Sequence, residues 1–367
     1  MGRLLQLFEE HGQSPWLDNL KRGWITSGEL ERWVERGVRG ITSNPTIFQK
    51  AIGAGHDYDE QFGDLVASGS SVDESYWALV SRDIEDALRI LRPVHDASGG
   101  VDGFVSVELA PDLARDTEGS YRAAKELHEQ IAEPNLFVKI PGTSEGLDAI
   151  RRSIADGHSI NVTLLFGLGR YGEVIEAYLS GLEELVVRGG DPARVASVAS
   201  FFVSRVDTEV DRRLEAVGGG EALGLKGKAA VANARLAYQL FLERFSGPRW
   251  ETLAAAGARV QRPLWASTST KNPDYPDTLY VDTMIGPDTV NTMPEATLEA
   301  FDDHGPLART LDADPAGDRA FVERLAALGI DLEEVAAQLE EEGVASFAKS
   351  FDELIGTLAA KADELRD

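Results

Sequence analysis

Two kinds of hydrophobic pattern alternate along the chain. Short runs rich in β-branched and aromatic residues predict strands, and longer segments whose apolar residues recur every three or four positions predict helices. The predicted strands are 16–20, 38–43, 103–109, 136–140, 159–166, 195–202, 263–267 and 278–281, and the helices between them include 74–91, 117–132, 146–156, 171–188 and 227–245. This α/β alternation favours a closed parallel (β/α)8 (TIM) barrel over an open sheet, because eight strands close that barrel.

The C-terminal part of the chain departs from the alternation. No further strand is predicted from residue 286 to residue 367, and the segments 332–339 and 344–365 have the pattern of amphipathic, charge-rich helices. We therefore expect a single barrel domain over residues 1–367, with additional helices in the inserts. We expect the C-terminal helices, from about residue 310 to residue 367, to pack on the barrel.

Polar residues occupy one face of three consecutive predicted strands, those at 103–109, 136–140 and 159–166. Successive side chains of a strand point to opposite faces. If the apolar face packs on the helices, then Glu108, Lys139, Asn161 and Thr163 point into the barrel, toward the carboxyl ends of their strands. Active sites of such barrels lie at that end, so these residues are the first candidates for a site.

Charge and composition exclude several classes of function. The 36 Lys and Arg against 62 Asp and Glu leave a net charge of −26, which repels the phosphates of nucleic acids and anionic lipids, so neither is an expected partner. Without cysteine the chain has no disulfide, thiolate zinc site, iron–sulfur cluster or cysteine nucleophile. The six His residues are scattered without ligand spacing, so no metal site is expected.

No cofactor or membrane segment is expected either. Residues 167–172 fit the dinucleotide-binding pattern G-x-G-x-x-G, but the acidic residue that should end the next strand is missing, because Asp191 precedes that strand. Glu9 and Glu10 interrupt the N-terminal apolar run, so we expect no secretory signal there. The longest informative uncharged stretch has 13 residues, too few to span a bilayer. These features predict a cytoplasmic protein.

Lys139 is the most unusual residue of the pattern, because it lies in the middle of a buried strand. An ammonium group there is costly to desolvate, and buried lysines are almost always paired or catalytic. One interpretation is an ion pair with Glu108 on the neighbouring strand. The other is an amine that forms a Schiff base, which must be neutral to attack a carbonyl. The ionised forms of Asp18 and Glu108 would oppose neutrality, so we expect at least one of them to be protonated or separated from the lysine by water.

Six segments in unbroken order resemble the transaldolase family, Schiff-base transferases of the pentose phosphate pathway, over roughly residues 12–300. They are GITSNPTIF (40–48), SVEL (106–109), NLFVKIPGT (135–143), INVTLLF (160–166), SFFVSRVD (200–207) and ASTSTKN (266–272). The resemblance implies a (β/α)8 barrel with an imine-forming lysine on its fourth strand, and Lys139 is on the fourth predicted strand. It implies sugar phosphates as partners and neither a cofactor nor a metal.

The resemblance also assigns roles to residues. Lys139 would attack the ketone, Glu108 and Thr163 would move protons through a water molecule, and Asp18 would deprotonate the hydroxyl next to the bond that breaks. The residues implied in substrate binding are Thr42, Asn44, Asn161 and Ser200 for the three-carbon unit, and Arg205, Ser269 and Lys271 for the phosphate.

Three functions remain open at this point. The expected one is transfer of a dihydroxyacetone unit from sedoheptulose 7-phosphate to glyceraldehyde 3-phosphate. The second is a fructose 6-phosphate aldolase-type lyase, which uses the same imine and releases free dihydroxyacetone; Glu108 favours transfer, since such relatives tend to carry another polar residue there. The third is a sugar-phosphate-binding barrel without turnover, which the joint presence of Asp18, Glu108 and Lys139 disfavours. The chain can be a monomer or a homodimer.

Overall fold

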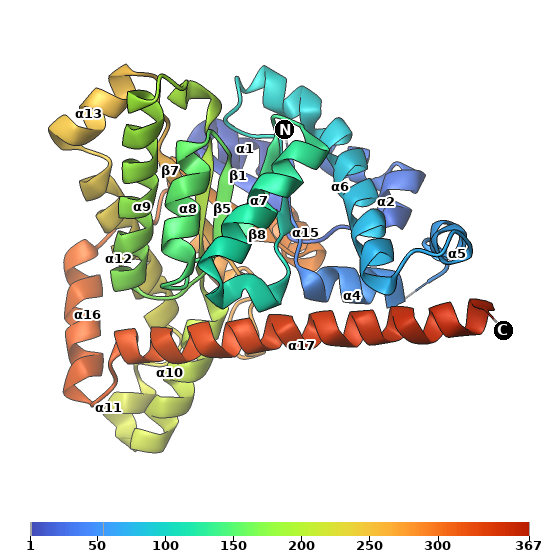
Figure 1. Cartoon of the computed structure of the whole chain (residues 1–367). Coiled ribbons are helices and arrows are strands. Elements are labelled where there is room, and N and C mark those ends of the chain that lie inside the picture. The colour runs from blue at the N-terminus through green and yellow to red at the C-terminus, as the bar shows by residue number, and fades with distance from the viewer. Residues whose placement is uncertain (1, 54, 367) are drawn as a thin grey trace.

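The core of the molecule is a closed barrel of eight parallel strands (Figure 1), and the computed structural model describes residues 2–53 and 55–366. The strands are β1 (Gln13–Leu17), β2 (Gly40–Thr42), β3 (Phe104–Glu108), β4 (Leu136–Pro141), β5 (Ile160–Leu165), β6 (Ser197–Phe202), β7 (Gln261–Ala266) and β8 (Thr289–Met293). Each strand pairs with the next along the chain, and β8 pairs with β1. The predicted (β/α)8 fold is confirmed.

Helices connect the strands and cover the barrel. They are α1 (Arg3–His11), α2 (Arg22–Ser27), α3 (Glu29–Arg36), α4 (Pro45–Gly53), α5 (Asp59–Ala67), α6 (Val72–Ala97), η1 (Pro111–Arg115), α7 (Thr117–Ile131), α8 (Gly146–Ala155), α9 (Leu168–Val187), η2 (Pro192–Arg194), α10 (Ser204–Val217), α11 (Gly219–Leu223), α12 (Ala229–Arg244), α13 (Gly247–Ala255), α14 (Leu279–Asp282), α15 (Glu295–His304), α16 (Pro315–Ala327) and α17 (Leu332–Arg366). The two terminal helical segments predicted at 332–339 and 344–365 form one continuous helix, which passes through Gly343 without a break.

The eighth strand was predicted in the wrong place. Residues 278–281 belong to the helical turn α14, whereas β8 lies at Thr289–Met293, inside the region where no strand was expected. A short apolar run does not distinguish a buried helical turn from a strand. In β8 the polar Asn291 is buried inside the protein and bonds the Thr268 hydroxyl at 2.9 Å, so the strand lacks the apolar signature. The first strand also begins three residues before its predicted start of 16.

The interior of the barrel is aromatic at its amino end. Phe104 and Phe137 stack with ring centroids 4.1 Å apart, and Trp16 lies 6.1 Å from Phe137. Beyond them, a buried Asp102 accepts hydrogen bonds from Trp16 Nε1 at 3.0 Å and Arg39 Nε at 2.8 Å. The polar groups at the amino end are thus hydrogen-bonded to one another. The polar residues at the next interior positions, toward the carboxyl ends of the strands, remain available for chemistry.

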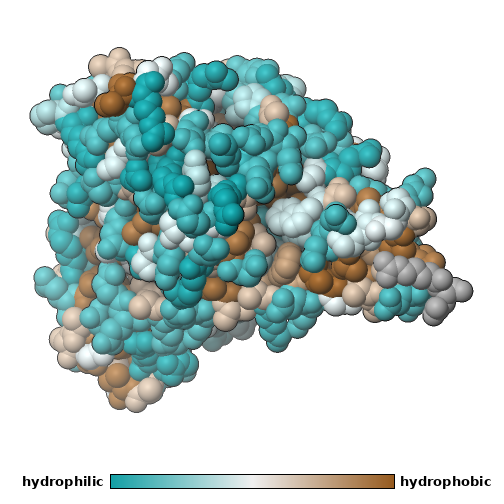
Figure 2. Space-filling view, viewed as in Figure 1, coloured by the Kyte–Doolittle hydropathy of each residue, from teal (hydrophilic) through white to brown (hydrophobic). Residues whose placement is uncertain are grey.

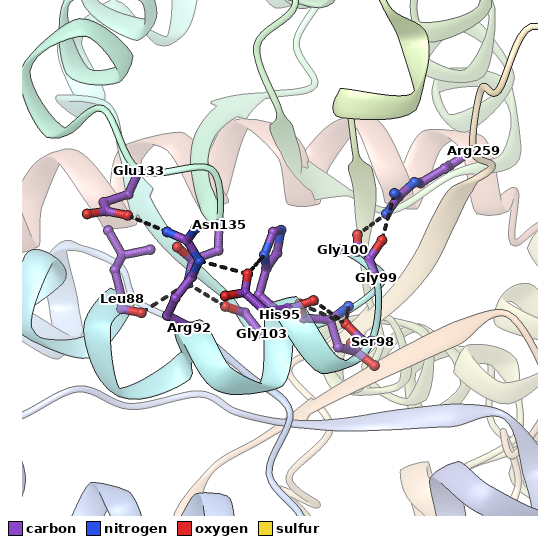
Figure 3. Close-up of polar contacts among 12 residues, drawn as sticks. Leu88, Arg92, His95, Ser98, Gly99, Gly100, Gly103, Glu133, Asn135 and Arg259 are labelled. Carbon is purple, nitrogen blue, oxygen red and sulfur yellow. Dashed lines mark hydrogen bonds and ion pairs between the residues drawn. The ribbon is translucent and has the colours of Figure 1, made fainter.

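A groove of about 730 Å³ lies outside this amino end, on the face opposite the candidate site. Arg259, which lines the groove, donates to the carbonyl of Gly99 at 2.8 Å, and next to the groove Asn135 Nδ2 donates to the carbonyl of Gly103 at 2.8 Å (Figure 3). Arg92 bridges Asp96 and Glu133 at 2.8 and 3.1 Å. These contacts tie strand and helix ends together. Residues at this end of such a barrel serve stability, so we assign the groove no catalytic role.

The surface agrees with the acidic composition. Figure 2 shows a mostly hydrophilic face, with apolar residues along its lower part, where Figure 1 places α17. Among the described residues, no helix combines the length and apolar character needed to cross a bilayer.

Candidate active site

A cavity of about 120 Å³ opens at the carboxyl ends of the strands. All but two of the predicted site residues line it. The lining consists of Asp18, Thr42, Asn44, Lys139, Thr163, Ser200, Phe202, Arg205, Ala266, Ser267, Ser269, Lys271, Thr292, Pro294 and Phe347. The two exceptions, Glu108 and Asn161, each hydrogen-bond to a residue that faces the cavity. The fold therefore gathers the predicted residues in one place.

Lys139 lies at the bottom of the cavity and is held in place by two acceptors. Its Nζ donates to Glu108 Oε2 at 2.9 Å and to the backbone carbonyl of Ser43 at 3.1 Å. Glu108 and Lys139 are register partners on β3 and β4, and their side chains are 4% and 5% exposed, respectively. The ion pair suggested by the sequence therefore exists, and its nitrogen still faces the cavity. Both sequence-based interpretations of Lys139 are compatible with this geometry.

Burial changes the acidity of the pair's carboxyl group. Desolvation raises the pKa of Glu108, although the positive charge of Lys139 opposes this shift. A carboxylate with a raised pKa accepts a proton more readily than an exposed one. The 2.9 Å hydrogen bond is a direct route for that proton, and its transfer leaves a neutral amine on Lys139.

Asp18 follows β1 and is oriented by two hydroxyl groups. Thr42 Oγ1 donates to Asp18 Oδ1 at 2.7 Å and lies 2.7 Å from Thr292 Oγ1. Because the Thr42 hydroxyl has one hydrogen, the Thr292 hydroxyl must be the donor in the second contact. Burial raises the pKa of Asp18, against the Thr42 hydrogen bond and the charges of Lys139 and Lys271. This carboxyl group is fixed in direction and holds its proton more tightly than an exposed aspartate.

Strands β5 and β6 add a row of neutral polar groups. Asn161 Nδ2 donates to Ser106 Oγ at 3.0 Å, and Ser200 Oγ donates to Asn161 Oδ1 at 2.7 Å. The Thr163 hydroxyl is buried and makes no hydrogen bond to any residue that the structure describes. Asn161 therefore holds Ser200 toward the cavity, and Thr163 retains its full capacity to donate and accept at the cavity wall.

Asn44 enters the cavity from the segment between β2 and α4. Its Oδ1 accepts the backbone N–H of Ile47 at 3.0 Å, which caps the first turn of α4. The amide oxygen is thus engaged in the cap, and the Nδ2 group is the part of the side chain left to act as a donor in the cavity.

Positive charge gathers at the mouth of the cavity. Lys271 Nζ donates to Ser269 Oγ at 2.6 Å, and Arg205 lines the same space. Burial lowers the pKa of Lys271, and the positive charge of Arg205 adds to the shift. Two neighbouring cations in a chain of net charge −26 can attract an anion, since a bound anion would offset the repulsion that Arg205 exerts on protonated Lys271.

Tyr275 anchors the loop that carries Ser269 and Lys271. Tyr275 OH donates to Asp211 Oδ2 at 2.6 Å, and Gly227, with φ of 71°, leaves room for its ring. A Cβ at Gly227 would lie 2.8 Å from the Tyr275 ring. The loop between β7 and α14 is therefore fastened to α10 rather than left free.

The sequence analysis missed six of the lining residues, namely Phe202, Ala266, Ser267, Thr292, Pro294 and Phe347. Three of these, Thr292, Phe202 and Phe347, come from a strand or helix and bear on the chemistry of the site. Thr292 belongs to β8, so a correct assignment of that strand would have pointed to it. Phe202 lies inside one of the family-like segments, yet an apolar residue carries no chemical signal of its own. Phe347 comes from α17, where an apolar position is expected simply for packing. Only the path of α17 reveals its place at the cavity.

Comparisons with known proteins agree with the resemblance. A family model described as transaldolase/fructose-6-phosphate aldolase matches residues 15–358. A transaldolase of Parafrankia sp. is 52% identical over 98% of this chain and 98% of its own length. A transaldolase of Frankia alni is 50% identical over 95% and 94%, and transaldolase 1 of Streptomyces avermitilis is 50% identical over 97% and 94%.

Proposed function

Because the chain belongs to the transaldolase/fructose-6-phosphate aldolase family, we propose that it catalyses the transaldolase reaction through an imine on Lys139. A dihydroxyacetone unit moves from sedoheptulose 7-phosphate to glyceraldehyde 3-phosphate, giving erythrose 4-phosphate and fructose 6-phosphate. The observation that carries the proposal is a buried amine, hydrogen-bonded to an acid, in a cavity whose mouth holds two cations.

Imine formation starts with the proton that Lys139 and Glu108 share. Once Glu108 holds it, the neutral amine attacks the ketone carbon and forms a carbinolamine. Loss of hydroxide from that carbon needs an acid, and Glu108 returns its proton for this purpose through a water molecule held by the Thr163 hydroxyl. The product is an iminium ion on Lys139.

The iminium ion then drives cleavage of the carbon–carbon bond. Asp18 removes the proton of the hydroxyl on C4, the C3–C4 bond breaks, and its electron pair moves into the iminium to give an enamine. The phosphorylated aldehyde leaves. In the second half of the reaction the enamine carbon attacks the acceptor aldehyde, whose oxygen takes the proton back from Asp18. Water then adds to the resulting iminium ion and the C–N bond breaks, which releases fructose 6-phosphate and the Lys139 amine. Thr42, Asn44, Asn161 and Ser200 bind the hydroxyl groups of the three-carbon unit throughout.

Trapping the imine tests this proposal. Borohydride reduces an imine to a stable secondary amine, so treatment with fructose 6-phosphate should add a three-carbon unit to Lys139. Peptide mass mapping of the reduced protein locates the adduct. An unmodified Lys139 in a protein with full turnover would falsify the proposed mechanism.

We expect Lys271→Ala to raise KM for phosphorylated substrates while kcat changes little, because the phosphate is remote from the reacting carbon. Loss of one hydrogen bond to a charged group corresponds to about a tenfold to hundredfold rise in KM. Steady-state kinetics, which measure KM and kcat separately, check this prediction. The matched control is Lys50→Ala, since Lys50 is an exposed lysine whose charge acts on Lys271 without lining the cavity. An equal loss with unphosphorylated fructose as donor would contradict a phosphate-binding role.

The aldolase-type lyase is the less favoured alternative, because the relatives named above are all called transaldolases. Release of free dihydroxyacetone from fructose 6-phosphate without an acceptor aldehyde distinguishes the two activities. A cytoplasmic location and the choice between monomer and homodimer remain predictions.

A further inference from the structure

Helix α17 crosses the carboxyl end of the barrel as a single long rod (Figure 1). Contacts along its length fix it to loops and helices on both sides of the cavity. Near its start, Glu333 Oε1 accepts the backbone N–H of Gly169 at 3.1 Å. Past the middle, Ser350 Oγ accepts from Thr46 Oγ1 at 2.8 Å, and Glu353 accepts from Gln49 Nε2 at 2.7 Å. The helix is therefore held on both sides of the site that it crosses.

The middle of α17 is shaped to approach the barrel closely. A Cβ at Gly343 would lie 2.9 Å from the Leu164 side chain and 3.7 Å from Arg205 Nη1, so only glycine allows this approach without displacement. One turn further on, Phe347 is 5% exposed and lines the cavity that holds Lys139. With Phe202 it supplies the aromatic surface of the lining. The close contact at Gly343 thus places the Phe347 ring over the cavity.

The enamine is the intermediate whose fate depends on whether the Phe347 ring shields it from water. After cleavage the enamine can attack the acceptor aldehyde, which forms a new carbon–carbon bond. It can instead take a proton on the same carbon, after which water adds to the iminium and the C–N bond breaks, releasing dihydroxyacetone and the lysine amine. Both routes consume the same electron pair, so the access of water to the enamine decides between them.

We propose that Phe347 determines the specificity for transfer by excluding water from the enamine carbon, an inference that rests on the proposed imine mechanism. The C-terminal helix is then part of the active site and supplies one side chain that favours transfer over release. Phe347 is a specificity-determining residue and takes no part in proton transfer.

The test compares Phe347→Ala with Phe351→Ala. Phe351 lies on the same helix, is half-buried and packs edge-on against Tyr76 at 5.2 Å, but does not line the cavity. The measurement is the ratio of two initial rates with fructose 6-phosphate: dihydroxyacetone release without acceptor, and transfer to erythrose 4-phosphate. We expect this ratio to rise about tenfold or more in Phe347→Ala and to stay at the wild-type value in Phe351→Ala. Phe347→Leu, which retains part of the cover, should lie between.

Two failures are distinguishable. If borohydride leaves Lys139 of the wild-type protein unmodified, the imine mechanism itself is wrong. If the adduct forms but the ratio in Phe347→Ala or Phe347→Leu equals that of Phe351→Ala, the mechanism stands and the role of Phe347 is overturned. Should Phe347→Ala not fold, the Leu variant alone decides between these outcomes.

Discussion

Lys139→Met should reduce turnover by more than about 10⁴-fold, because it removes the buried amine beside Glu108 that forms the imine. Lys271, the other lysine that lines the cavity, lies at its mouth, where we assign it to the phosphate. Methionine keeps most of the side-chain volume, so the barrel interior stays packed. It also removes the charge that pairs with Glu108. Since burial already raises the pKa of Glu108, that carboxyl group can take up a proton and remain neutral inside the barrel. We therefore expect a folded, inactive protein, as measured by coupled kinetics and by thermal unfolding.

Lys139→Arg is the control that separates charge from nucleophilicity. Arginine preserves a cation beside Glu108, yet its guanidinium stays protonated and forms no imine with a ketone. This variant should be as inactive as Lys139→Met and should give no borohydride adduct. Substantial turnover in either variant would show that Lys139 does not form the imine, and turnover in Lys139→Arg alone would mean that its charge is what the site needs.

The second large effect is expected for Asp18→Asn, which should reduce transfer by about 10²- to 10⁴-fold, the usual contribution of a positioned general base. Asparagine has nearly the same shape and still accepts the hydrogen bond from Thr42, so the cavity should keep its geometry. Imine formation at Lys139 does not require Asp18. Borohydride should therefore trap a six-carbon adduct from fructose 6-phosphate in place of the three-carbon adduct. A three-carbon adduct in this variant would show that another group breaks the bond.

The pH profile gives an independent check on Asp18. The base must be ionised to act, and burial raises the pKa of this carboxyl group above its usual value. Activity should therefore fall as the pH drops through this raised pKa, at a higher pH than an exposed aspartate would cause. In Asp18→Asn the residual activity should lose that acidic limb. Persistence of the same limb would assign it to Glu108, whose pKa is raised for the same reason.

Much of the site was predictable because successive side chains of a strand point to opposite faces. The alternation in β3, β4 and β5 was enough to place Glu108, Lys139, Asn161 and Thr163 inside the barrel, and the carboxyl ends of parallel strands meet in one place. The ion pair between Glu108 and Lys139 was also predictable, because the two residues lie on neighbouring strands. The strand that failed was β8, where the consecutive residues Asn291 and Thr292 lie on opposite faces, and both bond to polar partners, so the apolar signal is hidden.

Local pattern and residue chemistry thus determined the barrel, the buried lysine and the groups that flank it, because these depend on strand period and on neighbours in strand order. The contact of Thr292 with Thr42, the shift of acidity at Asp18 and the cover formed by Phe347 were decided only by the tertiary structure. Each depends on the distance between segments far apart in the sequence. Such distances follow from how a long helix or a closing strand packs, and no short stretch of residues encodes that packing.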